Sequence, residues 1–236
     1  MVSPARKHFM KSSAAQAAAE AEAQQPQTGD AYELMFAALV EDRRRLKDIQ
    51  SIERKIELKA ELLPNYESYV LGVLEEGSGA QDDVLMTVMI WCLDVGRIDL
   101  ALNIGEYAME HELKSPEAYQ REVPSILVEE LADHYLRNER YRPKFENGDL
   151  IVPDEDSWQD EINQVIQHLK VVDRITEHAD MHDQIRAKHQ KALGWAYSLT
   201  GQFDAALESL NRALQLDKNA GVKKDIERLQ KLRSSS

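Results

Sequence analysis

The stretch from Gln190 to Asp217, "QKALGWAYSLTGQFDAALESLNRALQLD", constrains the fold more than any other part of the chain. Small residues recur in it at helical spacing, and Gly201 interrupts the pattern near its middle. Small side chains let two helices approach closely, while larger ones fill the groove between them. The small residues are Gly194, Ala206 and Ala213, and the larger ones are Leu193, Tyr197, Phe203, Leu210 and Leu216. We therefore predict a helix, a tight turn and a second helix packed against the first.

The spacing of these residues is that of a tetratricopeptide helix–turn–helix unit, although Gln190 and Lys218 stand where the repeat has Trp and Pro. The same offsets recur after Gly96, where "GRIDLALNIGEYAM" matches "GQFDAALESLNRAL" in Gly, Asp, Ala and Leu. Two copies are fewer than the about three that a free-standing solenoid needs. The sequence therefore predicts a compact all-α protein built from helical hairpins with tetratricopeptide-like packing.

The composition fits a helical protein and argues against membrane insertion. The 236 residues include only 10 Gly and 7 Pro, which favours helix. Cys92 is the single cysteine, so an intramolecular disulfide is excluded and a reducing cytoplasm is the expected location. The most apolar stretch, 84–93, is half of the roughly 20 residues that a membrane span needs. We expect neither membrane contact nor a secretory signal.

The N-terminal half is predicted to combine an arm and a helical domain. Residues 1–29 are poor in large apolar side chains, so we predict a mobile arm there. A long N-terminal helix is predicted from Asp30 to about Leu63, with Pro64 ending it. This long basic helix and the first helical hairpin belong to an N-terminal domain over 30–137.

The remainder of the chain is predicted to form a second domain after a surface excursion. Asn147-Gly148 is flanked by Phe145 and a run of aliphatic residues, a pattern typical of a short β-hairpin near 144–152. We assign 138–156 to the surface excursion that contains this hairpin. Residues 157–236 then form a tetratricopeptide-like helical domain.

The net charge of −13 makes DNA binding by the whole surface unfavourable, so any DNA contact needs a local basic patch. Residues 43–59 hold seven basic side chains against three acidic ones. The favoured interpretation is a solvated helix with i,i+4 ion pairs. The alternative is a face that binds the DNA backbone, in an oligomer joined along a partial heptad seam. The basic residues are Arg43, Arg44, Arg45, Lys47, Arg54, Lys55 and Lys59, and the seam residues are Met35, Leu39, Leu46, Ile49 and Ile56.

A second local excess of positive charge lies near the end of the chain. Two interpretations fit it: compensation of a helix dipole at a C-terminus, or a phosphate-binding patch. Both stay open, and Lys223 and Lys224 are the candidates for DNA contact. The full set of basic residues is Lys218, Lys223, Lys224, Arg228, Lys231 and Arg233.

Three aspartates, Asp82, Asp83 and Asp94, are the candidate catalytic residues. Carboxylate oxygens suit Mg²⁺, and phosphodiester cleavage commonly uses such ions. Adjacent helix residues point about 100° apart, however, and short polar side chains cap helix starts. We therefore favour the interpretation that Asp82-Asp83 begins a buried helix. No glycine loop followed by lysine is present, so an ATP site is not expected.

Three segments carry a family resemblance. They are "ELLPNYESYVLGVLEEGSGAQDDVLMTVMIWCLDVGRIDLAL", "ADMHDQIRAKHQKALG" and "NAGVKKDIERLQK", and the N-terminal "SPARKH" fits as well. Together they resemble the small terminase subunit of peduovirus-type tailed phages. The resemblance covers nearly the whole chain, and "GAQDDVLMTVM" is its most specific part.

The resemblance implies a terminase endonuclease subunit that acts in the host cytoplasm. Such a subunit works with a large ATPase subunit to recognise and cut the cohesive-end (cos) site of concatemeric phage DNA, which starts packaging. It implies cos DNA and the large subunit as partners, a homo-oligomer, and Mg²⁺ if this chain itself cleaves DNA. The nuclease centre could lie in this chain or in the large subunit. The alternative from the residues alone is a tetratricopeptide-like adaptor that binds only protein.

Overall fold

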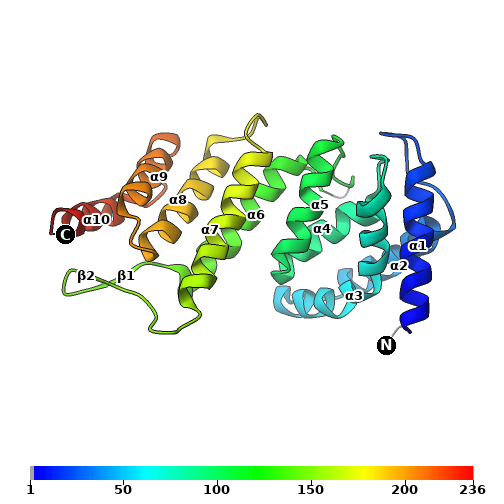
Figure 1. The fold of residues 1–236 in the computed structure, drawn as a ribbon, viewed down its shortest axis with the longest axis horizontal. Helices are drawn as coiled ribbons and strands as arrows, with labels where there is room; N and C mark the ends of the chain where they lie inside the picture. The colour runs from blue at the N-terminus through cyan, green and yellow to red at the C-terminus, as the bar shows by residue number, and fades with distance from the viewer. Residues whose placement is uncertain (1–2, 118, 236) are drawn as a thin grey trace. The chain divides into compact units, whose positions relative to one another are not determined.

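The computed structural model describes residues 3–117 and 119–235, and it is helical almost throughout (Figure 1). Apart from one 3-10 turn and a two-stranded hairpin, the regular elements in these ranges are α-helices, which confirms the predicted all-α class. None of the described helices is long and apolar enough to cross a membrane. The chain divides into two compact units, 1–123 and 124–236, and each is described by itself.

The first unit is organised around α4, whose side chains are buried on every face. Residues 84–93 are all buried, as expected for a helix that is apolar all round. Helices α3 and α5 supply most of the contacts that cover α4, and α2 supplies fewer. The helices of this unit are α1 (Pro4–Glu20), α2 (Asp30–Lys47), α3 (Ile52–Glu76), α4 (Asp83–Val95) and α5 (Ile98–Glu110).

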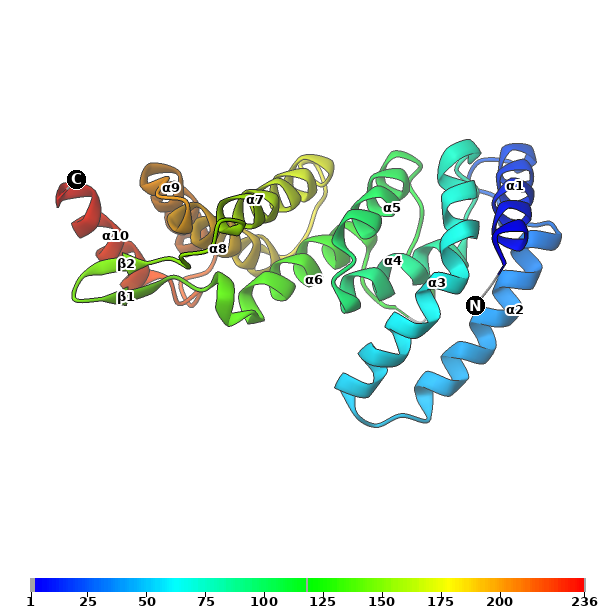
Figure 2. The same cartoon turned by 60° about the horizontal axis from the view of Figure 1, so that its bottom comes forward.

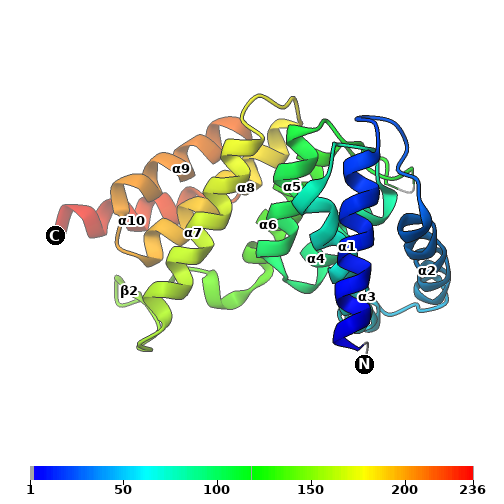
Figure 3. The same cartoon turned by 45° about the vertical axis from the view of Figure 1, so that its right-hand side comes forward.

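We predicted a mobile arm for 1–29, and this prediction is wrong for α1. That helix packs along α3 (Figure 3). Met10, Ala14 and Ala18 face inward and are buried. Ala14 and Ala18 have small side chains, and Gly72 on α3 has none, so the two helices can approach closely. A segment with few large apolar residues can therefore bury a face when its partner helix presents a glycine.

The long helix predicted for 30–63 is also corrected, because residues 48–51 separate α2 from α3. The Ser51 side chain accepts a hydrogen bond from the backbone N–H of Arg54 and caps the new helix. Pro64 does not end α3 but lies inside it. Pro64 and Ala60 are both exposed, so the helical hydrogen bond that Pro64 removes lies on the solvent side of α3.

Both predicted helical hairpins are present. Gly96 separates α4 from α5 and Gly201 separates α8 from α9, each with a left-handed backbone (φ of 78° and 74°) that suits glycine. In the second hairpin, a Cβ added to Gly194 would lie 2.6 Å from Leu210 Cγ, so glycine permits this close packing. The match to the tetratricopeptide class in particular stays a prediction.

In its described residues, the second unit contains the short β-hairpin and five α-helices. Lys144 pairs with Ile151 and Glu146 with Asp149, around a turn at Asn147-Gly148, which confirms the predicted hairpin. We assigned α6 to the first domain by ending that domain at 137, whereas the compact units divide at 123/124. The elements are α6 (Val123–Arg137), η1 (Glu139–Tyr141), β1 (Lys144–Glu146), β2 (Asp149–Ile151), α7 (Trp158–Ile175), α8 (Asp183–Leu199), α9 (Phe203–Leu216) and α10 (Lys223–Ser235).

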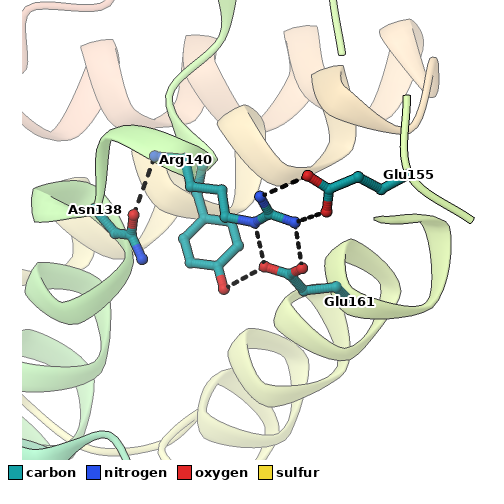
Figure 4. Close-up of polar contacts among 5 residues, drawn as sticks. Asn138, Arg140, Glu155 and Glu161 are labelled. Atoms are coloured by element: carbon teal, nitrogen blue, oxygen red, sulfur yellow. Dashed lines mark hydrogen bonds and ion pairs between the residues drawn. The ribbon is translucent and has the colours of Figure 1, made fainter. Parts of the chain in front are cut away.

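An ion-pair cluster centred on Arg140 holds the excursion against α7 (Figure 4). The guanidinium donates to both oxygens of Glu161, at 2.8 Å each, and to both oxygens of Glu155. It also lies over the Trp158 ring, 5.1 Å from the centroid. The hydrogen bond from Arg140 lowers the pKa of Glu161. Because two carboxylates already occupy this arginine, we do not count it among the candidate DNA contacts.

We predict that Gly72→Ala detaches α1 from α3. The new Cβ would overlap the backbone carbonyl oxygen of Lys11, and a backbone atom cannot move aside as a side chain can. The free energy of unfolding, measured by urea titration, should fall by about 1–3 kcal/mol. Trypsin cleavage after Lys11, followed by mass spectrometry, should become faster.

The matched control is Leu71→Ala, which removes an exposed side chain from the neighbouring position of the same helix. It should leave both measurements close to those of the unaltered chain. If trypsin cuts after Lys11 equally fast in the unaltered chain and in Gly72→Ala, α1 is not held as described.

Candidate nucleic-acid interface

The end of the α2–α3 hairpin carries the first basic patch and projects beyond the other helices of its unit (Figure 2). We call residues 43–59 the basic end. Helix α2 contributes residues 43–47, and α3 contributes residues 52–59. The break at 48–51 therefore gathers, around one turn, cations that a single straight helix would spread along its length.

Carboxylates neutralise three of the seven cations of the basic end. Arg44 pairs with Glu41 at 2.7 Å, and Lys59 pairs with Asp94 of α4 at 2.5 Å. Arg45 donates to Asp42 at 2.9 Å. Within 3–117 and 119–235, no carboxylate partner is recorded for the other four, Arg43, Lys47, Arg54 and Lys55. These four side chains are the strongest candidates for phosphate contact.

Three of the five residues of the partial heptad seam pack within the chain. Met35, Leu39 and Leu46 are buried within their own unit. Asp42, which interrupts the seam, is also buried and accepts a hydrogen bond from the Tyr66 hydroxyl of α3 at 2.8 Å. These residues therefore turn the rest of α2, including its cations, toward solvent. Of the other two seam residues, Ile49 is half-buried and Ile56 is exposed, and the homo-oligomer stays a prediction.

The sequence pattern did not single out Ile52, the first residue of α3. Its side chain is 76% exposed, although isoleucine inside an amphipathic segment ordinarily faces a core. Only the break at 48–51 places it at an open helix start. No signal in the sequence alone distinguishes it from the buried isoleucines.

The second basic patch lies on α10 in the other unit. Lys223 and Lys224 are exposed in the first turn, where positive charge opposes the helix dipole. Dipole compensation therefore does not account for these two lysines. Arg228 lies over the Phe145 ring at 5.1 Å, and Arg233 pairs with Asp204 at 2.9 Å. Lys223 and Lys224 stay candidates for DNA contact.

Asp82 caps the buried helix α4. Its Oδ1 accepts the backbone N–H of Leu85 at 2.8 Å, and its Oδ2 accepts the Tyr69 hydroxyl at 2.5 Å. The side chain is fully buried, and this burial raises its pKa from an ordinary 3.8 to about 6. Burial and the charge of Asp82 both raise the pKa of Tyr69 as well. The carboxylate is thus occupied by structural hydrogen bonds.

The three candidate catalytic aspartates do not form one site. Asp83 is the first residue of α4 and is half-buried, next to the fully buried Asp82. Asp94 lies at the other end of α4, roughly 18 Å along the helix from Asp82 at 1.5 Å per residue, and pairs with Lys59. Within the described part of the chain, no group of three or more His, Cys, Asp or Glu side chains could hold a metal ion. The placement therefore favours the capping interpretation of Asp82-Asp83.

We predict that Asp82→Asn changes how stability depends on pH. The folded-state pKa of Asp82 lies above its ordinary value, so its stabilising contribution is present below pH 3.8 and is lost as pH rises through about 6. Asparagine caps helices well and carries no charge. From pH 4 to 7, the unaltered chain should lose up to about 3 kcal/mol of unfolding free energy relative to the variant. Urea titrations at several pH values measure this difference.

Asp83→Asn is the matched control, since it alters the adjacent half-buried carboxylate and leaves the cap intact. It should not reproduce the pH-dependent difference. A constant difference between Asp82→Asn and the unaltered chain across this range would contradict the proposed burial of a titrating carboxylate.

The chain is similar to proteins of one phage family. The family model described as "Phage small terminase subunit" matches residues 36–184. The chain is 41% identical over 231 residues to the "Terminase, endonuclease subunit" of Escherichia phage P2, which covers 98% of this chain and 85% of that protein. It is 24% identical over 220 residues to the "Probable terminase, endonuclease subunit" of Haemophilus phage HP1 (strain HP1c1), covering 85% and 69%. No solved structure matches the chain.

The family model spans both the basic end and the capped helix α4, and the phage P2 relative covers nearly all of the chain. The resemblance read from the sequence is thereby confirmed. This chain belongs to the phage small terminase subunit family.

Proposed function

We propose that this chain recognises the cos site of concatemeric phage DNA and directs the cut that starts genome packaging. Small terminase subunits work with a large terminase subunit and with DNA. The printed names of both relatives call those proteins endonuclease subunits. We place this action in the host cytoplasm. We assign ATP hydrolysis to the large subunit, because this sequence carries no glycine loop for ATP.

The observation that carries the proposal is the separation of charge. The basic end has seven cations against three anions, a net charge of +4, and this leaves −17 for the rest of the chain. Phosphates are attracted to such an end and repelled by the remainder, which orients the protein on the duplex. The four cations without a recorded carboxylate partner would contact the backbone. They are Arg43, Lys47, Arg54 and Lys55.

We assign site recognition to this chain and leave the chemistry of the cut to be located by experiment. If this chain cleaves DNA, Mg²⁺ is the expected cofactor, since carboxylates and phosphate oxygens suit it. Asp82 and Asp94 are engaged by Tyr69 and Lys59, however, and lie at opposite ends of α4. We therefore do not assign Asp82, Asp83 and Asp94 to a shared metal site.

We predict that Arg54→Glu/Lys55→Glu weakens binding to cos DNA and reduces its salt dependence. Each lost phosphate contact should lower the slope of log K against log salt by about 0.9. The fold should persist because Glu at position 54, three residues after the Ser51 cap, completes a capping box. Fluorescence anisotropy titrations with a cos duplex at several salt concentrations measure both quantities.

Two comparison variants accompany this measurement. Lys170→Glu/Arg212→Glu makes the same change in net charge at exposed positions outside both patches and should keep the salt slope. Lys223→Glu/Lys224→Glu tests the patch on α10. If the variant at 54 and 55 binds like the unaltered chain, the basic end is not the interface. If the unaltered chain shows no binding at moderate salt, the protein-binding adaptor is favoured instead.

A cleavage assay locates the nuclease centre. With Mg²⁺ and cos DNA, we expect cutting when the large subunit and this chain are combined, and intact DNA with this chain alone. If this chain alone nicks DNA and still does so after Asp82→Asn, Asp83→Asn and Asp94→Asn, the nuclease centre lies at other residues of the chain. Nicking abolished by those changes would contradict the capping interpretation.

A further inference from the structure

The basic end presents an apolar side chain to solvent at its tip. Ile52 is the first residue of α3 and is 76% exposed, and Ile56, one turn later on the same face, is 36% exposed. Exposed aliphatic residues are ordinary when they lie singly among neutral neighbours. Here they lie in the basic end, where seven cations, including Lys47, Arg54 and Lys55, outnumber the three acids Asp48, Glu53 and Glu57.

Several contacts support this tip, and the one between Asp42 and Tyr66 is buried. Leu46 anchors the end of α2, and Ser51 caps the start of α3. Farther back, Asp42 and Tyr66 join α2 to α3 through a buried hydrogen bond. Lys59 ties α3 to Asp94 of the core helix α4. Because these contacts hold the backbone at Ile52 in place, its side chain can keep its position when a ligand binds.

Charge decides which ligand fits this tip. The basic end that carries Ile52 has a net positive charge, so a ligand with negative charge on either side of a place that accepts an aliphatic side chain fits it. A DNA duplex does so, because phosphates line the minor groove and the faces on which neighbouring bases stack are apolar. Proteins that bind the minor groove often insert Ile, Leu or Phe between two base pairs and bend the duplex.

We propose that Ile52 is a wedge that enters the minor groove and partly unstacks one base step when the basic end binds DNA. This inference rests on the proposed DNA-binding function. The cations hold the flanking phosphates, and the isoleucine opens the step between them. The duplex then bends away from the protein, and Ile56 covers the opened groove wall. Sequences with a flexible step at that point, such as TA or CA, would be favoured without any base-specific hydrogen bond.

The test measures bending and binding separately. A cos duplex that carries a donor and an acceptor dye at its two ends reports the bend by energy transfer, and anisotropy of the same duplex reports affinity and salt slope. The unaltered full-length chain should bend the duplex by about 20–90°. Ile52→Ala should lose about half or more of the energy-transfer change, while the salt slope stays the same because no phosphate contact is removed. Ile52→Leu should retain the bend.

The control is Leu71→Ala, which truncates another exposed aliphatic side chain of α3 outside the basic end and should leave the bend unchanged. An unchanged bend in Ile52→Ala would overturn the wedge. So would a loss of self-association by Ile52→Ala in light scattering with the bend intact, since Ile52 would then belong to a contact between copies. If binding depends on Arg54 and Lys55 but the DNA does not bend, the wedge proposal is contradicted and the proposed DNA-binding function stands. Failure of the unaltered chain to bind cos DNA removes the proposed function with it.

Discussion

The burial of α4 is the constraint on which the rest of the first unit depends. A helix that is apolar on every face has to be surrounded, and α2, α3 and α5 supply the cover. Its two ends are fixed by polar contacts, Asp82 with Tyr69 at one end and Asp94 with Lys59 at the other. The same acidic side chains that could have suggested a metal site are therefore used to position this helix. Asp82 and Asp94 each join α4 to α3, at opposite ends of α4.

That support has a consequence for the surface. Because the apolar seam of α2 is buried within the unit, the cations on the other faces of α2 and α3 point outward. The break at 48–51 then brings the two cationic segments to one projecting turn (Figure 2). A chain with a net charge of −13 thus presents a local positive end, and its own acidic surface disfavours other modes of DNA contact. We propose that this chain recognises DNA through the cations at the end of the α2–α3 hairpin.

Much of the fold could be read from local patterns. Gly96 and Gly201 mark the two turns because a left-handed residue ends a helix, and Asn147-Gly148 marks the β-hairpin for a similar backbone reason. The prediction of a mobile N-terminal arm was wrong because few large apolar side chains are present there, yet large side chains are not what this packing needs. Packing of α1 depends instead on alanines meeting Gly72, which lies more than fifty residues away in the sequence. Pro64 was misjudged because its cost depends on whether the unpaired carbonyl reaches water.

The sequence by itself determined the helical hairpins, the family and the position of the positive charge, since each depends on neighbours along the chain. The tertiary structure alone decided which cations are neutralised, because Lys59 and Asp94 are 35 residues apart and meet only when α3 packs on α4. It also decided that Asp82 is a buried cap with a raised pKa and that Ile52 is exposed. Burial and ion pairing are set by helices that cross in space, and no periodicity within one segment specifies what the other side of a contact will be.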